Sequence, residues 1–343
     1  MKYEVLNSLR GISAILIAIG HYFYFTGNGD KYPISFILGV DFFFILSGLV
    51  LYNSLMKNND DKIDKYVGKL IKGRFFRLYI PYAILGIIFC IIHGLPNLYT
   101  LTVIFTLTQN LGFSPGGYYL GETIFGISWA LSLEFWIGTI FMTIMFKLKK
   151  NKFKTKYVLM ILIWLCLFII VKNSPLYLNV HYHEVNRIPL GIFRIILGYS
   201  VGVMIYFFSE RIKNSNIITK NKNFYTILEI GIIIFIIIIY GKTNYNKMND
   251  FLFFLYGGMG VLIFSIENGL ISKLLKTNIF KFMGKISFSI YLVHPFIIDI
   301  FRDKILNIYN LLIYLVVVII VSILNFYFIE NIGLKLKKSL RTT

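Results

Sequence analysis

Long apolar segments separated by short polar ones recur along the whole chain. A helix needs about 20 predominantly apolar residues to cross a bilayer, and ten segments approach or reach this length. We predict spans at 8–27, 34–53, 76–93, 126–146, 156–172, 190–208, 224–240, 251–267, 286–302 and 311–330. The pattern predicts an all-α integral membrane protein with about ten transmembrane helices.

The basic residues orient these spans. Most of the 35 Lys and Arg residues fall in segments that share one side when the N-terminus is cytoplasmic, and cytoplasmic loops carry the excess of positive charge. Both termini are therefore predicted in the cytoplasm. Residues 97–111 are apolar but short and rich in Thr, Asn and Gln. As an eleventh span they would move the lysine cluster at 147–156 outside, so we predict a re-entrant or interfacial helix there.

Composition agrees with a membrane protein. The 343 residues are 57% hydrophobic and 15% charged, whereas a soluble domain carries about 25% charged residues. The net charge of +19 does not indicate nucleic-acid binding, because the lysines flank apolar segments and form no solvated basic face. We predict no nucleic-acid partner; the lipid bilayer is the expected surroundings.

The chain is expected to form one domain, 1–343, without a fused soluble domain. Its first apolar run is not followed by a small-residue cleavage site, so that run is predicted to be a retained helix and no signal peptide. Cys90 and Cys166 lie in different apolar segments, which gives no disulfide framework and no metal site.

Three ionisable residues lie inside predicted spans at one depth. His21, Asp41 and Glu134 lie on the first, second and fourth spans, each about 10–12 Å below the outer surface at ~1.5 Å per residue. An ionisable side chain within a span is costly and usually faces a cavity or a partner. We therefore predict an acid–base site near the outer surface.

A second layer lies toward the cytoplasm. It contains Arg10 on the first span, Arg74 and Arg77 at the inner end of the third, and His294 on the ninth. Arg10 and His21 are eleven residues apart, which places them on one helix face about 16 Å from each other. That face could line a passage from an inner cationic site to the outer acid–base site.

Structural explanations compete with these functional ones. The three arginines also fit positively charged anchors that reach the inner surface. His294 precedes a proline and also fits a helix-breaking turn, and Asp41 also fits a helix cap or a polar contact between helices. His21 and Glu134 could likewise be structural, and the "HYH" at 181–183 is predicted to be loop, since two histidines make no metal site.

The residue types point to proton transfer and phosphate binding. A buried histidine near a carboxylate is typical of a general base, and arginine binds phosphate through its bidentate fork. The sequence lacks the G-x-x-x-x-G-K-[ST] motif of a P-loop. The pattern G-x-S-x-G occurs at 112–116 and within the predicted span 190–208, at 198–202, but neither lies between a predicted strand and a helix, so no hydrolase-type nucleophile elbow is predicted. Residue chemistry alone leaves two classes open: a membrane acyltransferase using acyl-coenzyme A, and a proton-coupled transporter.

Five motifs in order resemble the membrane acyltransferase-3 family. "LRGISAILIAIGH" is similar to that family's R-x10-H signature, and "GVDFFFILSGLVLY" to its G-V-D-x-F-F-x-x-S-G-F stretch, with Leu49 at the last position. "RFFRLYIPY" resembles its R-x-x-R segment, "SWALSLEFW" its W-S-L-x-x-E pattern, and "SFSIYLVHPF" its Y-L-x-H pattern. The end, "FIENIGLKLKK", keeps Glu330 but lacks the proline that often follows it in the family.

The resemblance implies an O-acyltransferase of the bacterial cytoplasmic membrane. It implies transfer of an acyl group, usually acetyl, from cytosolic acyl-coenzyme A to a hydroxyl of a glycan such as capsule, exopolysaccharide or O-antigen. Acetyl-coenzyme A would be a co-substrate, with no permanently bound cofactor and no metal. His21 would be the base with Glu134 and Asp41 as polar partners. Donor binding would fall to Arg10, Arg74 and Arg77, with His294 grouped beside them. The alternative is a glycan or lipid flippase or transporter without acyl-transfer chemistry.

Overall fold

The computed structural model describes most of the chain. The described residues are 3–27, 38–58, 62–113, 128–174, 184–215, 221–240, 247–301, 307–333 and 335–336. The "HYH" segment at 181–183 lies outside them.

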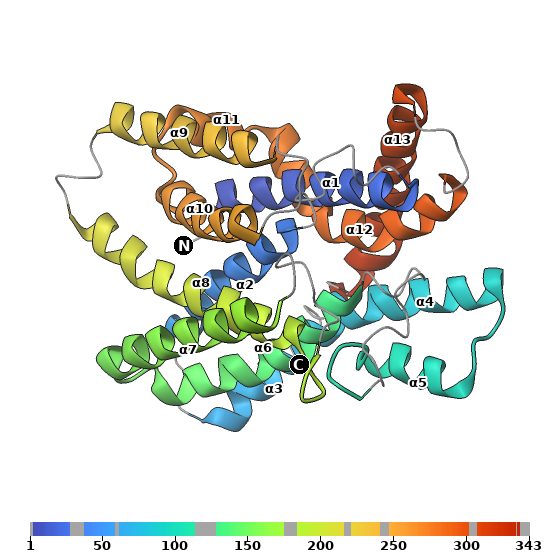
Figure 1. Ribbon diagram of the computed structural model, residues 1–343, viewed down its shortest axis with the longest axis horizontal. Coiled ribbons are helices and arrows are strands. Elements are labelled where there is room, and N and C mark those ends of the chain that lie inside the picture. The colour runs from blue at the N-terminus through green and yellow to red at the C-terminus, as the bar shows by residue number, and fades with distance from the viewer. Residues whose placement is uncertain are drawn as a thin grey trace.

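The described part is almost entirely helical (Figure 1). Its α-helices are α1 (Glu4–Phe25), α2 (Gly39–Met56), α3 (Ile63–Arg74), α4 (Ile80–His93), α5 (Leu98–Thr106), α6 (Trp129–Leu148), α7 (Lys152–Asn173), α8 (Leu190–Asn214), α9 (Lys222–Tyr240), α10 (Lys247–Ile266), α11 (Leu270–Leu275), α12 (Asn278–Phe301) and α13 (Ile308–Asn325). Two π-helical segments, η3 (Phe75–Tyr79) and η5 (Phe326–Glu330), continue α3 and α13, and two short strands, β1 (Glu184–Val185) and β2 (Ile188–Pro189), pair antiparallel.

The predicted all-α membrane class is confirmed. Among the described residues, eight helices are long and apolar enough to cross a membrane: Glu4–Phe25, Gly39–Met56, Ile63–Ile92, Trp129–Leu148, Lys152–Asn173, Leu190–Asn214, Asn278–Phe301 and Ile308–Gly333. Helices α9 and α10 lie at the other two predicted spans. The helix at the third predicted span, 76–93, begins well before residue 76. The basic segment α3 runs through η3 into the apolar α4 without a break.

The segment 97–111 forms a helix too short to cross a bilayer. Helix α5 has nine residues, begins where the Asn97 side chain accepts a hydrogen bond from the Thr100 N–H (2.8 Å), and ends at Leu107, whose φ is 55°. Nine residues rise about 14 Å, less than half of a hydrocarbon core of about 30 Å. Its re-entrant or interfacial position stays a prediction.

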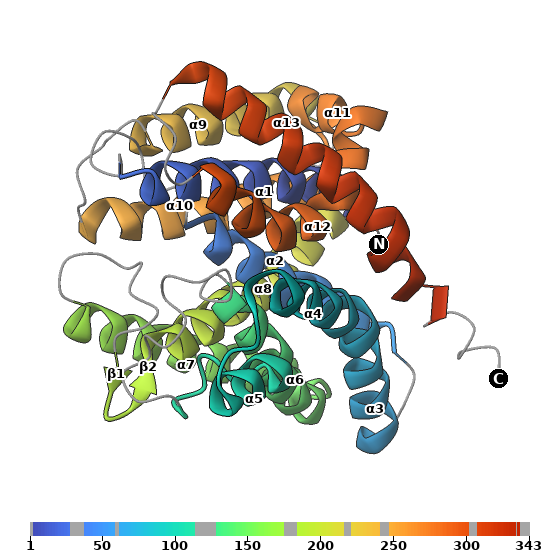
Figure 2. The same ribbon diagram turned by 90° about the vertical axis from the view of Figure 1, so that its right-hand side faces the viewer.

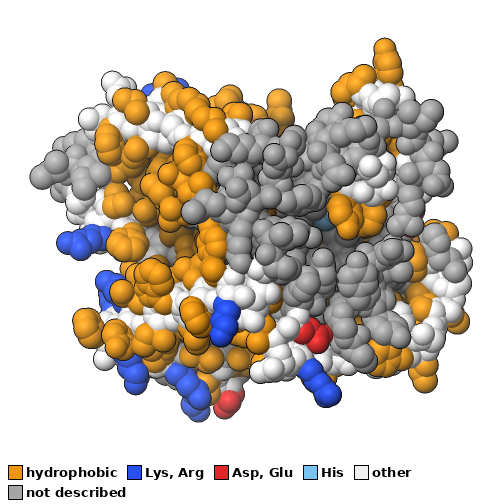
Figure 3. Space-filling model, viewed as in Figure 1, with side chains coloured by type: hydrophobic (Ala, Val, Ile, Leu, Met, Phe, Trp, Pro, Cys, Tyr) orange, Lys and Arg blue, Asp and Glu red, His pale blue; other side chains and the backbone are white. Residues whose placement is uncertain are grey.

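The helices form two groups that meet at α2. In both views α1 and α9–α13 lie in the upper part and α3–α8 in the lower part, with α2 between them (Figures 1 and 2). Large apolar side chains on outward-facing helices are exposed, and a space-filling view shows broad hydrophobic surface with Lys and Arg toward its edges (Figure 3). Such a surface suits lipid and would be unfavourable in water.

Helices α1 and α12 pack closely and in parallel. Glu4 and Lys281, near the two helix starts, form an ion pair of 2.8 Å. A Cβ on Gly11 would lie 2.5 Å from the backbone carbon of Met283 and 2.6 Å from the backbone nitrogen of Gly284. Small residues allow backbones to approach in this way in membrane bundles, so the side chains further along these two helices are held face to face.

Helices α2 and α8 are also parallel, because Asp41 near the start of α2 pairs with Arg194 near the start of α8. Helix α2 is antiparallel to α1, since Gly39 at its start lies against Ile17, late in α1. These relative directions agree with the alternation that ten spans require. The cytoplasmic location of the termini stays a prediction.

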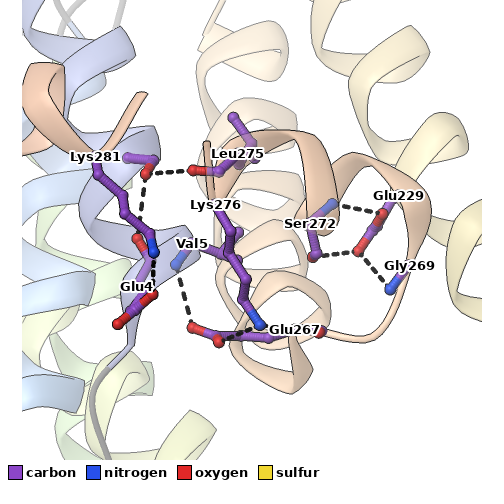
Figure 4. Close-up of polar contacts among 10 residues, drawn as sticks. Glu4, Val5, Glu229, Glu267, Gly269, Ser272, Leu275, Lys276 and Lys281 are labelled. Carbon is purple, nitrogen blue, oxygen red and sulfur yellow. Dashed lines mark hydrogen bonds and ion pairs between the residues drawn. The ribbon is translucent and has the colours of Figure 1, made fainter. Parts of the chain in front are cut away.

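A buried carboxylate on α9 binds the start of the short helix α11 (Figure 4). Glu229 on α9 is fully buried and accepts hydrogen bonds from the backbone N–H groups of Gly269 (3.1 Å), Ile271 (3.0 Å) and Ser272 (3.1 Å), and from the Ser272 hydroxyl. The first N–H groups of a helix lack intrahelical partners. Glu229 therefore caps α11 from a neighbouring helix.

We expect Glu229→Ala to lower the free energy of unfolding by about 2–4 kcal/mol, because it leaves buried donors without a charged acceptor. Denaturation of the purified protein in detergent measures this change. Lys281→Ala is the matched control: it breaks the Glu4–Lys281 pair, whose side chains are 34% and 42% exposed, so its effect should stay below about 1 kcal/mol. Equal losses in the two variants would contradict the capping role.

Candidate active site

Two histidines from distant parts of the chain meet in the membrane-spanning region. His21 Nδ1 on α1 lies 3.0 Å from His294 Nε2 on α12, and the rings are nearly parallel, with centroids 5.2 Å apart. His294 Nδ1 lies 3.0 Å from the backbone oxygen of Ile290. His294 is fully buried and His21 is 8% exposed. The pair is thus a hydrogen-bonded unit shielded from water.

The placement of His294 in an inner layer was wrong. That placement assumed a span starting at residue 286, whereas α12 starts at Asn278. His294 therefore lies ~24 Å along α12 and His21 ~26 Å along α1. Because these two helices run in parallel from paired starts, both histidines reach the same level.

Asp41 is held by an arginine. Arg194 Nη2 donates to Asp41 Oδ2 (2.7 Å) and Arg194 Nε to Asp41 Oδ1 (3.2 Å), and both residues are buried. The guanidinium carbon also lies 5.0 Å from the centre of the Trp129 ring. Both carboxylate oxygens of Asp41 thus accept hydrogen bonds from Arg194. The sequence had instead predicted Asp41 as a polar partner of His21.

Glu134 belongs to a network that joins four helices. Ser47 Oγ on α2 donates to Glu134 Oε1 (3.0 Å). Arg74 Nη1 donates to the Glu134 backbone oxygen, and Arg74 Nη2 to the hydroxyl of Tyr199 on α8 (3.2 Å). Gly138 makes room for this, since a Cβ there would lie 2.7 Å from that hydroxyl and 2.9 Å from Arg74 Nη2. The buried Arg74, expected near the inner surface, therefore reaches the helix that carries Glu134.

Tyr291 lies beside the histidine pair on α12. Its ring centre lies 5.9 Å from that of His294, one helical turn away. It also lies within electrostatic range of Glu134 and Tyr82. His21, His294 and Tyr291 thus lie together, and Glu134 is within electrostatic range of Tyr291.

Arg10 and Arg77 form a cationic region around a buried carboxylate. Arg10 Nε donates to Ser287 Oγ (2.8 Å), and Arg10 is within electrostatic range of Arg77 and Glu330. Glu330 is buried and accepts a hydrogen bond from Ser289 Oγ (2.7 Å). Glu134 also lies within electrostatic range of Arg10, so two guanidinium groups share this region with two carboxylates.

Both π-helical segments lie at this region. Segment η3 carries Arg77 and η5 carries Glu330, and a Cβ on Gly333, just after η5, would collide with the backbone oxygen of Phe76 in η3. π-Helical turns are frequent at functional sites. Here they bring the Arg77 and Glu330 side chains toward Arg10.

Sequence reasoning missed several members of the site. Arg194 and Glu330 are ionisable residues within or beside apolar segments, and that signal was available in the sequence. Ser47 and Tyr199 carried no such signal, because hydroxyl side chains are common in membrane helices.

No group of three or more His, Cys, Asp or Glu side chains that could hold a metal ion exists among the described residues. The cysteines Cys90 and Cys166 are buried thiols. The described part of the site presents imidazole, carboxylate, guanidinium and hydroxyl groups.

A sequence model for the acyltransferase-3 family, described as an acyltransferase domain, matches residues 3–329. The chain belongs to this family. No curated protein and no solved structure matches it. Family membership and the apolar helices together establish a multi-pass membrane acyltransferase.

Proposed function

We propose that this acyltransferase moves an acetyl group from cytosolic acetyl-coenzyme A to a hydroxyl of a cell-surface or lipid-linked polysaccharide, in the cytoplasmic membrane of a bacterium. The observation that carries the proposal is the buried His21–His294 pair in a chain of the acyltransferase-3 family. An imidazole can take and return one proton as a general base.

The reaction needs one base. His21 takes the proton of the acceptor hydroxyl while the hydroxyl oxygen attacks the thioester carbon. The new carbon–oxygen bond forms, the carbon–sulfur bond breaks, and the coenzyme A thiolate takes the proton from the His21 imidazolium. Protons and electron pairs balance, so no further reactant is required.

The cationic region suits the donor. Arg10 and Arg77 lie near one another on the side that the loop charges predict to be cytoplasmic. Arginine binds phosphate by paired, charge-assisted hydrogen bonds, and coenzyme A carries several phosphates on a long arm. We assign phosphate binding to Arg10 and Arg77, with the acyl end directed toward His21.

Glu134 and Asp41 receive different roles. Glu134 is within electrostatic range of Tyr291, whose ring lies beside that of His294, which favours contact with the acceptor or with the charge that develops during transfer. Asp41 neutralises Arg194 within the bundle, which favours a role in keeping α2 and α8 in register.

Mass spectrometry of the surface glycan with and without the gene tests the function. We expect an ester-linked acetyl group that disappears on deletion and returns with the wild-type gene. A glycan that lacks no acyl group but fails to reach the surface would overturn the proposal in favour of a flippase. A different acyl mass, such as succinyl, would keep the reaction and change its donor.

Arg77→Ala is expected to raise the KM for acetyl-coenzyme A by about 10- to 100-fold, the loss of a charge-assisted hydrogen bond, with folding intact. Arg74→Ala should in addition lower stability, because it leaves the Glu134 carbonyl and Tyr199 hydroxyl without their donor. Kinetics in membrane vesicles and unfolding in detergent separate the two effects. Lys273→Ala, an exposed lysine on the same predicted side, is the control, and an unchanged KM in Arg77→Ala would refute the assignment.

A further inference from the structure

The histidine pair has a definite order of donors and acceptors. A backbone carbonyl only accepts hydrogen bonds, so the contact between His294 Nδ1 and the Ile290 oxygen (3.0 Å) requires a proton on His294 Nδ1. A fully buried imidazole is neutral unless a charge compensates it, and a neutral ring carries one proton. His294 Nε2 therefore has a lone pair and accepts.

The same reasoning fixes the position of the proton on the His21 ring. Because His294 Nε2 accepts, the 3.0 Å contact requires a proton on His21 Nδ1. In the neutral His21 ring the remaining nitrogen, Nε2, then carries the lone pair. The sequence of groups Ile290 carbonyl, His294, His21 thus decides which nitrogen of His21 is basic.

We infer that His294 is the positioning residue for the base: it fixes the His21 proton on Nδ1 and directs the basic Nε2 lone pair toward the acceptor hydroxyl. The inference rests on the proposed function for the part that His21 plays in transfer. The order of protons itself rests on the geometry alone.

The sequence grouped His294 with the residues predicted to bind the acyl donor. Its surroundings favour the positioning role instead. Its ring is fully buried and both nitrogens are engaged, by His21 and by Ile290. Arg10 contacts α12 well before this point along the helix, at Gly284 and Ser287. The donor-binding arginine and His294 therefore lie at different levels of α12.

The pair also limits where the transferred proton can go. When His21 Nε2 takes a proton, the Nδ1–H of the resulting imidazolium still donates to His294 Nε2. His294 Nε2, which already accepts from this N–H, stabilises the positive charge through that hydrogen bond. The proton stays on His21 Nε2 until the coenzyme A thiolate receives it.

Two amide substitutions at His294 separate this role from others. The amide of glutamine reaches the place of the imidazole Nε2, so His294→Gln can still accept from His21 Nδ1–H. The shorter asparagine reaches only the place of Nδ1, so His294→Asn keeps a donor to the Ile290 carbonyl and loses the contact with His21. Both variants are polar and similar in size, which makes them a matched pair.

The assay uses membrane vesicles from the expressing strain, radiolabelled acetyl-coenzyme A and the glycan of those vesicles as acceptor. We expect kcat in His294→Asn to fall about 100-fold, the scale of general-base catalysis, with the acetyl-coenzyme A KM within about 3-fold of wild type. His294→Gln should stay within about 10-fold of wild-type kcat. A raised donor KM in both variants would instead show donor binding, and equal kcat in the two would show a merely structural role.

Nitrogen NMR of ¹⁵N-histidine protein in detergent tests the proton order without activity. We expect a His21 signal of the Nδ1–H tautomer, assigned by its loss in His21→Asn, that shifts in His294→Asn. A proton on His21 Nε2 would overturn the inference even if acetyl transfer is found. Wild-type vesicles that transfer no acetyl group would instead overturn the proposed function, and the NMR result would still decide the order.

Discussion

Replacing His21 with asparagine is expected to lower acetyl transfer by about 10²- to 10⁴-fold, the contribution of a general base. Asparagine cannot take a proton at neutral pH, but its amide can occupy the place of Nδ1 and still donate to His294 Nε2. The buried partner therefore keeps its hydrogen bond, and the loss of rate reports the missing base rather than a disrupted core.

The matched control is Tyr24→Phe, which changes a side chain on the same helix that is 52% exposed. It should transfer acetyl at the wild-type rate. Radiolabel incorporated into glycan, measured at saturating acetyl-coenzyme A, gives the comparison. A His21→Asn protein that is folded and retains full activity would remove His21 from the mechanism.

Breaking the Asp41–Arg194 pair is expected to cause the largest loss of stability. Asp41→Ala leaves a buried guanidinium without its carboxylate, and removing one partner of a buried ion pair costs about 3–5 kcal/mol. Both side chains are almost fully buried, at 7% and 3% exposure, so water cannot replace the lost partner. Unfolding in detergent measures the change.

The double variant Asp41→Ala/Arg194→Met distinguishes a structural role from a catalytic one. It removes both charges and places an apolar chain against Trp129, so we expect most of the stability and of the acetyl transfer to return. If Asp41 acted on His21 in catalysis, the double variant would be stable but inactive.

The helix positions could be predicted from the sequence wherever local apolar and charge patterns determine them. Apolar segments and loop charges were sufficient to predict the class of the protein and helices at all ten positions. The start of α12 was misplaced, because residues 278–285 are polar enough to resemble a loop. They form helix since Gly284 packs against the α1 backbone at Asn7, a contact that no local pattern shows.

The site followed less completely, for the same reason. His21 and Glu134 were recognisable because ionisable groups are costly inside a membrane. Their partners are long-range: His21 and His294 are 273 residues apart, and Asp41 and Arg194 are 153 apart. The Ser47–Glu134 contact and the reach of Arg74 depend on helix packing and on the space at Gly138. Sequence spacing places residues at a depth, and only tertiary packing decides which of them touch.

The most direct test of acyl transfer by His21 is reconstitution. The purified protein in lipid nanodiscs would receive radiolabelled acetyl-coenzyme A and glycan isolated from a strain lacking the gene. We expect ester-linked label in the glycan, one coenzyme A released for each acetyl group transferred, and loss of both in His21→Asn. Intact, folded protein that releases no coenzyme A and labels no glycan, or that does both without His21, would contradict it.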